Sequence, residues 1–236
     1  LTFPPAVSFP HPGPSHIFGT QRFSRHLPLI TADEEVLGRK IPFYRDWLEH
    51  DLYDDYWRQI NTEEKLDQID VPAYQQAAWY DPYTESMLRV WNGLRERGYS
   101  ARARQNQKIY IIPWTHHHAE PSKLGDRDFG PQGYVDLKDE DLRWFDYWLK
   151  GIDNGIMNEP PLRLFVMGAN VWRNEQEWPL ARTVWTPYYL HSNGKANTLY
   201  GDGTLSPEPP ANEPPDRYEY DPANPVPTLG GNNSTW

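Results

Sequence analysis

The sequence predicts a mixed α/β domain with a parallel sheet, preceded by a helical segment and followed by an all-β region. Short apolar runs at 73–80 and 108–112 alternate with amphipathic helical patterns at 84–97 and 139–150. Strands that alternate with helices form parallel sheets, because each helix returns the chain to the same end of the sheet. No helical pattern follows residue 158, which predicts β structure from there on.

The composition excludes several functional classes. The 236 residues carry a net charge of −10 and contain no cysteine, while aromatic residues make up 14% and supply apolar area for a core. The acidic balance argues against nucleic-acid binding, since no basic stripe could neutralise phosphates. No apolar run reaches the roughly 18 residues of a membrane span. The lack of cysteine excludes a disulfide framework and thiolate chemistry, and it favours a cytoplasmic location.

Changes in composition and in the pattern of predicted elements divide the chain into residues 1–65, 66–157 and 158–236. The first region is rich in proline and aromatic residues, with short helices expected at 31–37 and 54–58, and it is typical of a lid or cap. Its opening residues have no cationic segment and do not form a signal peptide. Both ends of the sequence suggest that it was cut from a longer chain.

The run at 108–112 contains three isoleucines and a tyrosine, which predicts a buried strand. Pro113 cannot donate to a neighbouring strand, so pairing is expected to end there. His116 then follows the carboxyl end of the strand, where open α/β sheets bind ligands. With an ordinary pKa of about 6.5, His116 is a candidate general base.

Asp81 is the second candidate, because it follows one predicted strand and precedes a helix. It lies 35 residues before His116, a spacing that accommodates a helix and a return strand. Asp81 and His116 would then lie side by side at one end of the sheet. A carboxylate that orients a histidine supplies two members of a hydrolase triad. The alternative is that Asp81, which precedes Pro82, only forms a turn.

Neither a nucleophile nor a metal site is convincing. Ser15 lies among prolines and lacks the G-x-S-x-G spacing of a nucleophile elbow, so the nucleophile is expected upstream. His116, His117 and His118 lie near Glu120 and could bind a metal. Adjacent residues of an extended loop point in different directions, however, so we expect no metal and no cofactor.

The last region contains short β-like runs and turn signals. Asn193-Gly194 and Asp202-Gly203 are typical of tight turns. This pattern predicts the beginning of a jelly roll. Strands are expected at 162–167, 183–185, 188–191, 198–200 and 218–220.

Several longer motifs occur in order from about residue 45 to the end. They are D-Y-W at 55–57, I-D-V-P at 69–72, W-Y-D-P-Y at 79–83, I-P-W-T-H at 112–116, W-F-D-Y-W-L-K-G at 144–151, F-V-M-G-A-N-V-W-R at 165–173 and Y-Y-L-H-S at 188–192. Together they resemble the cocaine esterase / X-Pro dipeptidyl-peptidase-like α/β-hydrolases.

The resemblance implies an α/β-hydrolase domain with an inserted helical cap and a C-terminal jelly roll. Residues 1–65 would be a cap remnant, 66–157 the C-terminal part of the hydrolase domain, and 158–236 the N-terminal part of the jelly roll. Asp81 and His116 match the family's catalytic aspartate and histidine. The family's serine lies in a G-x-S-x-x-G elbow before the cap, so the resemblance implies a fragment without its nucleophile.

The expected function is hydrolysis of ester or amide bonds in a small-molecule or peptide substrate through an acyl-enzyme. The isolated fragment is expected to be inactive. Tyr83 is expected either to line the acyl pocket or to pack in the core. Simple esters, β-lactam side-chain acyl groups and X-Pro peptides all remain open as substrates, and so does a homodimer. The alternative function is a non-catalytic binding module with a ligand at its β-rich end.

Overall fold

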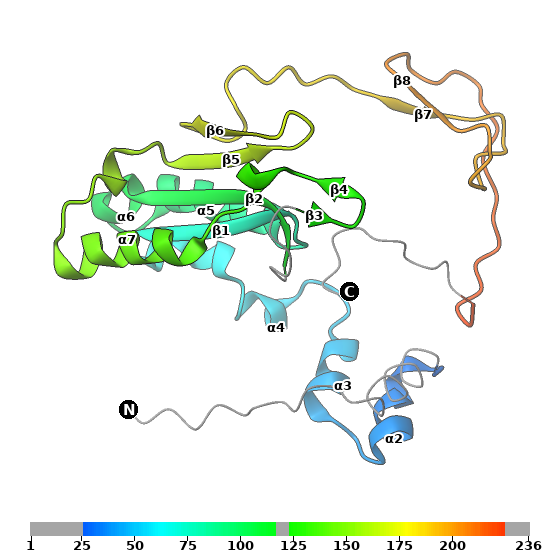
Figure 1. Cartoon of the computed structure of the whole chain (residues 1–236). Helices are drawn as coiled ribbons and strands as arrows, with labels where there is room; N and C mark the ends of the chain where they lie inside the picture. Colours follow the sequence, from blue (N-terminus) through cyan, green and yellow to red (C-terminus); the bar gives the residue numbers. More distant parts are fainter. Residues whose placement is uncertain (1–25, 117–122, 225–236) are drawn as a thin grey trace. The chain divides into compact units, whose positions relative to one another are not determined.

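The computed structural model describes residues 26–116 and 123–224 (Figure 1). These residues form two compact units. One consists of residues 26–61 together with 222–224, and the other contains the remaining described residues. The first unit is helical, and the second contains the sheet.

A buried ion pair organises the helical unit. The carboxylate of Asp33 is 1% exposed and accepts hydrogen bonds from Arg45 at 2.7 and 3.0 Å and from the Ile41 amide at 2.7 Å. The helices expected at 31–37 and 54–58 are confirmed with small shifts of their ends. The helices of this unit are η1 (Leu29–Thr31), α2 (Ala32–Leu37), α3 (Pro42–Glu49) and α4 (Asp55–Arg58).

The second unit is built on a four-stranded sheet with the order β1-β2-β5-β6. Strand β2 runs parallel to both β1 and β5, and β6 is antiparallel to β5. The parallel sheet predicted from the alternating pattern is therefore confirmed. Its strands are β1 (Ala73–Tyr80), β2 (Gln107–Thr115), β5 (Leu162–Val166) and β6 (Val171–Glu175).

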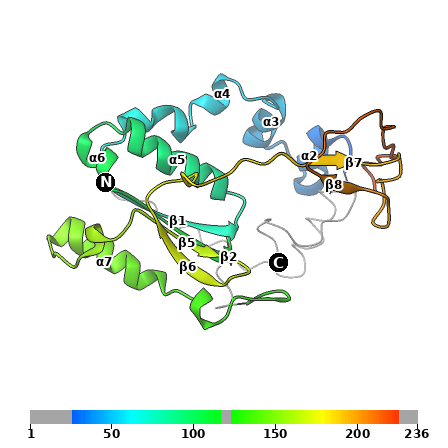
Figure 2. The same cartoon turned by 90° about the horizontal axis from the view of Figure 1, so that it is seen from above.

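Helices cover both faces of the sheet, as Figure 2 shows for α5 (Thr84–Arg97) and α7 (Leu137–Lys150). The alternation along β2 explains how it serves both faces. Ile109 and Ile111 pack with Trp91 of α5, whereas Tyr110 and Ile112 pack on the opposite face. Strand β2 is buried along its whole length except Thr115, as its continuous apolar run predicts. The smaller elements of the unit are η2 (Thr62–Gln68), α6 (Ala101–Gln105), β3 (Lys123–Leu124), β4 (Arg127–Asp128), η3 (Pro131–Gly133) and η4 (Ile156–Asn158).

The prediction that Pro113 ends strand pairing is wrong. Strand β2 continues through Pro113 to Thr115, which pairs with Tyr80. The register shifts between Ala78 and Tyr80, so β2 carries one extra residue there. A proline is tolerated at such a bulge, because the local break in the ladder removes the need for its missing amide donor.

Helix α7 buries a different face from the predicted one. The amphipathic pattern at 139–150 predicts that Leu142, Phe145, Trp148 and Leu149 pack inward. Trp148 is half-buried, and its ring centroid lies 5.7 Å from that of Trp144, but Leu142, Phe145 and Leu149 are 59%, 52% and 77% exposed. The inward face instead carries Trp144, whose ring centroid lies 5.5 Å from that of Tyr74 on β1. Leu142, Phe145 and Leu149 recur at helical spacing, and so do Trp144 and Trp148. The sequence pattern alone therefore does not show which face of the helix is buried.

The β-rich region differs from its prediction in strand membership. Strand β5 was expected to belong to a separate all-β region, yet it pairs with β2 in the main sheet. Strand β7 (Tyr189–His191) pairs with β8 (Thr204–Ser206) in a two-stranded antiparallel sheet. The runs at 183–185, 198–200 and 218–220 are not strands. The jelly roll and the three-region division stay predictions.

Candidate active site

The carboxyl ends of β1 and β2 bring two polar side chains together. Because Tyr80 pairs with Thr115, the next residues of the two strands, Asp81 and His116, lie side by side. The Oδ2 atom of Asp81 lies 2.9 Å from Nδ1 of His116. The juxtaposition expected from their spacing is therefore present in the structure.

Local hydrogen bonds fix the position of Asp81. Its Oδ1 atom accepts a bond of 2.8 Å from the Tyr83 amide, and its own amide donates to the Ala78 carbonyl at 2.9 Å. The Thr84 hydroxyl donates to the carbonyl oxygen of Asp81 at 3.1 Å and also to that of Ala78. These bonds join the end of β1 to the first turn of α5. The turn expected as an alternative role for Asp81 is thus part of the same arrangement.

The contact between Asp81 and His116 selects one form of the imidazole. An ionised carboxylate only accepts hydrogen bonds, so Nδ1 of His116 is the donor. In the neutral ring Nε2 is then the basic nitrogen. The Asp81 side chain is 14% exposed and that of His116 is 43% exposed. A carboxylate held below a more accessible imidazole can orient a general base and stabilise its protonated form.

Tyr83 lies beside this pair. Its ring centroid is 5.5 Å from that of His116, with an angle of 69° between the two rings. Tyr83 is 57% exposed, so the alternative that it packs in the core is wrong. Its ring instead forms an accessible apolar surface next to the histidine.

The structure leaves two of the predictions about this site without a test. Ser15, His117, His118 and Glu120 lie outside the described residues. Within residues 26–116 and 123–224, no group of three or more His, Asp or Glu side chains could hold a metal ion.

Thr84 is a contributor that sequence reasoning missed. Its hydroxyl bridges the carbonyls of Ala78 and Asp81, and the residue is 9% exposed. The available signal was a threonine at the first position of a helix, where hydroxyl groups commonly bond to nearby backbone.

The fold and this pair of side chains define the class. Parallel strands covered by helices, with an aspartate hydrogen-bonded to a histidine at the carboxyl ends of two neighbouring strands, define an α/β protein with a polar pair at the end of the sheet where such folds bind ligands.

Comparisons with known proteins identify the family. Residues 17–118 match the X-Pro dipeptidyl-peptidase (S15) family, and residues 154–234 match the X-Pro dipeptidyl-peptidase C-terminal non-catalytic domain. Cocaine esterase of Rhodococcus sp. (strain MB1 Bresler) is 35% identical over 204 residues, covering 85% of this chain and 34% of the esterase. The chain belongs to the cocaine esterase / X-Pro dipeptidyl-peptidase-like α/β-hydrolases, a family of serine hydrolases.

Two solved structures show the same fold. An aminopeptidase from a marine sediment Thaumarchaeota archaeon superposes with a TM-score of 0.59 at 23% identity, covering 83% of this chain and 31% of the aminopeptidase. An α-amino acid ester hydrolase superposes with a TM-score of 0.60 at 22% identity, covering 88% of this chain and 33% of that one. The chain thus spans about a third of the length of these relatives. None of the helices in its described part is long and apolar enough to cross a membrane.

Proposed function

We propose that this chain supplies the acid–base half of a serine hydrolase that cleaves ester or amide bonds through an acyl-enzyme. The observation that carries the proposal is the bond of 2.9 Å between Asp81 and His116 at the ends of adjacent parallel strands. The family assignment supports it, because this family consists of serine hydrolases.

The proposed mechanism gives each residue one role. A serine hydroxyl attacks the substrate carbonyl while Nε2 of His116 takes its proton, and a tetrahedral oxyanion forms. His116 then passes that proton to the leaving group, which departs as the carbonyl re-forms. Water attacks the acyl-serine in the same manner and releases the acid. Asp81 holds the Nδ1–H tautomer throughout and stabilises the transient imidazolium.

The nucleophile is proposed to come from sequence upstream of this chain. The 236 residues contain no G-x-S-x-G or G-x-S-x-x-G motif, and Ser15 is followed by glycine only at position 19. The coverage of 34% of cocaine esterase is consistent with a further segment. The chain alone is therefore expected to be inactive.

Tyr83 is proposed to form one wall of the acyl site. Its exposed ring lies beside the imidazole at a steep angle, where it could pack on an acyl group bound at the serine. The relatives differ in their named substrates, so the acyl group itself is left unassigned.

The deciding experiment uses a polypeptide that includes about 200 residues of upstream reading frame, a length expected for the other half of such a domain. Labelling with a fluorophosphonate probe and turnover of p-nitrophenyl acetate are measured together. His116→Ala should abolish both, and Asp81→Asn should lower kcat about 10⁴-fold through the wrong tautomer. Thr115→Ser, next to His116, is a control expected to retain activity.

Two results would contradict the proposal. Steady turnover by the 236-residue chain that is lost in Ser15→Ala would place the nucleophile within it. A folded longer protein that carries the elbow serine but reacts with neither reagent would favour the alternative, a binding module. That alternative has one observation in its favour, a hollow of about 660 Å³ beside β7 and β8 lined by Leu190, Leu205 and Pro214.

A further inference from the structure

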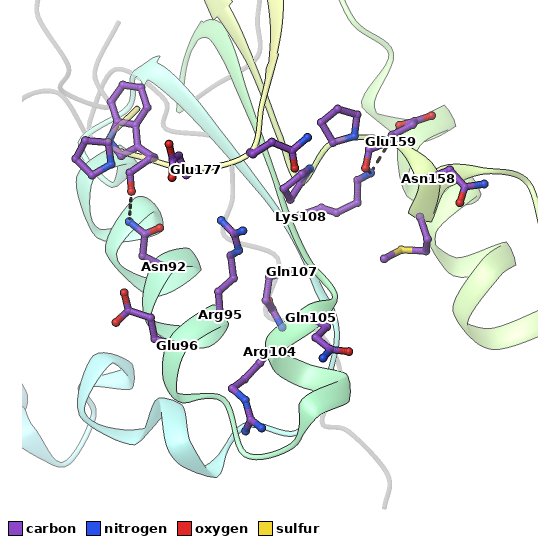
Figure 3. A pocket seen from close by; sticks show the side chains of 16 residues that line it. Asn92, Arg95, Glu96, Arg104, Gln105, Gln107, Lys108, Asn158, Glu159 and Glu177 are labelled. Atoms are coloured by element: carbon purple, nitrogen blue, oxygen red, sulfur yellow. Dashed lines mark hydrogen bonds and ion pairs between the residues drawn. The ribbon is translucent and has the colours of Figure 1, made fainter. Parts of the chain in front are cut away.

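A cavity of about 900 Å³ lies at the amino ends of the strands (Figure 3). Gln107 and Lys108, the first residues of β2, line it together with Arg95 of α5 and with Glu159 and Glu177. We refer to it as the Arg95 cavity. His116 follows the other end of β2, which at about 3.3 Å per residue is roughly 25 Å away. The cavity is therefore separate from the Asp81–His116 pair.

Arg95 has a cation–π contact but no polar partner among the described residues. Its guanidinium carbon lies 4.4 Å from the ring centroid of Trp91, and none of its N–H groups donates to a protein oxygen. Arg89 and Arg143, by contrast, each bind a glutamate. Burial lowers the pKa of Arg95, and the negative charge of Glu177 only partly opposes this shift. The N–H groups of Arg95 are therefore available to water or to a ligand that accepts hydrogen bonds.

Gln107, the first residue of β2, has a second polar group without a hydrogen-bond partner among the described residues. The Nε2 atom of Gln107 donates to the carbonyls of Val71 at 3.0 Å and Ala103 at 2.7 Å, which fixes the orientation of the amide. Its Oε1 atom is buried and has no hydrogen-bond partner, although the residue is only 2% exposed. Buried acceptors of this kind are normally satisfied by protein, water or ligand.

Lys108 contributes positive charge to the cavity, but a carboxylate oxygen of Glu159 already lies 3.8 Å from its ammonium nitrogen. It is 5% exposed, and its ammonium group donates to the carbonyls of Ile156 at 2.6 Å and Glu159 at 3.2 Å. Figure 3 shows Arg95 pointing from its helix into the cavity, with Gln107 and Lys108 on the neighbouring strand. Arg95 is thus the group best placed to receive an acceptor.

The acidic residues limit which anion can enter. Glu96, Glu159 and Glu177 line the same cavity, together with the cations Arg95, Arg104 and Lys108, so a doubly charged phosphate would meet three carboxylates. A singly charged carboxylate suits the planar fork of Arg95, and an N–H donor on the same molecule suits the carboxylate of Glu177.

We propose that the Arg95 cavity binds a small monocarboxylate that also carries an ammonium or amide donor, the chemistry of an α-amino acid. Its carboxylate accepts two hydrogen bonds from Arg95, and its nitrogen lies toward Glu177. This site is independent of the proposed hydrolase mechanism, because it uses neither Asp81 nor His116.

The test follows the side-chain Nε–H resonances of ¹⁵N-arginine-labelled protein during titration with glycine, acetate or inorganic phosphate. Arg102 is a matched internal control, since its guanidinium lies 5.1 Å from the Trp148 ring but does not line the cavity. Glycine should shift the Arg95 resonance saturably and leave Arg102 unchanged. Acetate and phosphate should bind more weakly. Arg95→Gln should weaken glycine binding about tenfold or more, whereas Arg102→Gln should not.

Three outcomes would overturn the proposal: no saturable shift of Arg95, equal shifts of Arg95 and Arg102, or tighter binding of phosphate than of glycine. Circular dichroism establishes that each variant is folded. If Arg95→Gln does not fold, Arg95→Lys decides. This variant keeps the charge and loses the fork, so it should also bind glycine more weakly, and unchanged affinity would contradict bidentate recognition.

Discussion

Tyr80 on β1 lies opposite Thr115 on β2, although Ala78 lies opposite Ile112. Two residues of β1 are therefore matched by three residues of β2. In an uninterrupted ladder Asp81 would stand opposite Thr115, and His116 would lie one position further on. Because β2 carries one extra residue at this point, His116 rather than Thr115 stands in line with Asp81.

Deleting Pro113 should leave Asp81 beside His116. The shorter β2 pairs with β1 without a bulge, so Thr115 stays opposite Tyr80 and His116 still follows in line with Asp81. The expected result is that the hydrogen-bonded Nδ1–H signal of His116 persists in proton NMR spectra. Inserting an alanine after Thr115 is the contrast, because it moves His116 one position beyond Asp81 and should abolish the signal. Loss of the signal in a folded Pro113 deletion variant would show that the contact needs the bulge itself and not only the register beyond it.

The two faces of α7 should differ sharply in their contribution to stability. Trp144 is 5% exposed and packs against Tyr74, whereas the neighbouring Phe145 is 52% exposed. We expect Trp144→Ala to lower the free energy of unfolding by about 3–5 kcal/mol. Phe145→Ala should change it by less than about 0.5 kcal/mol. Urea denaturation of the two variants measures both values, and similar losses would mean that α7 is rotated relative to the structure.

The helical unit should lose stability in acid through Asp33. The Arg45 side chain, together with the amides of Ile41 and Glu34, lowers the pKa of Asp33 to about 2 from an ordinary 3.8. A lowered carboxyl pKa contributes stability that is complete above pH 3.8 and is lost as the pH falls through 2. The protection factor of the Ile41 amide, which is the exchange rate of an unstructured amide divided by that of Ile41 at the same pH, should fall over this interval.

Substitutions distinguish the contribution of Asp33 to stability from that of its exposed neighbour Glu34. Asp33→Asn should weaken the unit already at pH 7 and remove the acid dependence, because the ion pair with Arg45 is lost. Glu34 also contacts Arg45, but its side chain is 44% exposed. Glu34→Gln should therefore have little effect on the stability of the unit. Equal effects of the two substitutions would contradict a special role for the buried carboxylate.

His191 should show the opposite pH dependence. Its Nδ1 atom lies 2.6 Å from Oε1 of Glu213, and its Nε2 atom lies 2.9 Å from the carbonyl oxygen of Glu208. Two hydrogen-bond acceptors favour the doubly protonated ring. The hydrogen bond with Glu213 is the main reason why the pKa of His191 is raised above 6.5. The resulting stability is complete below pH 6.5 and is lost as the pH rises through the raised pKa.

An NMR titration of the His191 ring measures this pKa directly. Glu213→Gln should move it back toward 6.5 and accelerate exchange of the Ser192 amide, which donates to Glu213 at 3.1 Å. Glu208→Gln should leave the pKa nearly unchanged, because only the backbone carbonyl of Glu208 contacts the ring. No difference between the two variants would be inconsistent with the ion pair.

The elements that the sequence predicts best are those whose signals are local. Strand β1 and helix α5 begin and end at the predicted residues, because turn formers and a long amphipathic repeat mark their ends. The meeting of Asp81 and His116 was also predictable. Both follow strands of one parallel sheet, and the 35 residues between them suit one crossover helix.

The features that escaped prediction depend on distant contacts. The apolar run of β5 has the same composition whether it pairs with β2 or with a separate sheet, so only the tertiary fold decides. The bulge at Pro113 depends on how β2 is matched to β1. The inward face of α7 depends on packing against Tyr74, which is far away in the sequence. That Arg95 has a cation–π contact but no hydrogen-bonded acceptor among the described residues can be recognised only from the positions of its neighbours in the structure.

Strand β1 also has a consequence for how the protein behaves at high concentration. It lies at the edge of the four-stranded sheet, and its eight residues include no charge, proline or glycine. Edge strands of natural sheets commonly carry charged residues or prolines, which prevent a strand of another molecule from pairing with them. Within the described residues no strand pairs with the outer side of β1, so this edge is available to a strand of the upstream segment proposed above or, without that segment, to a second copy of the chain. Dilute solutions are therefore the appropriate starting point for every measurement proposed above.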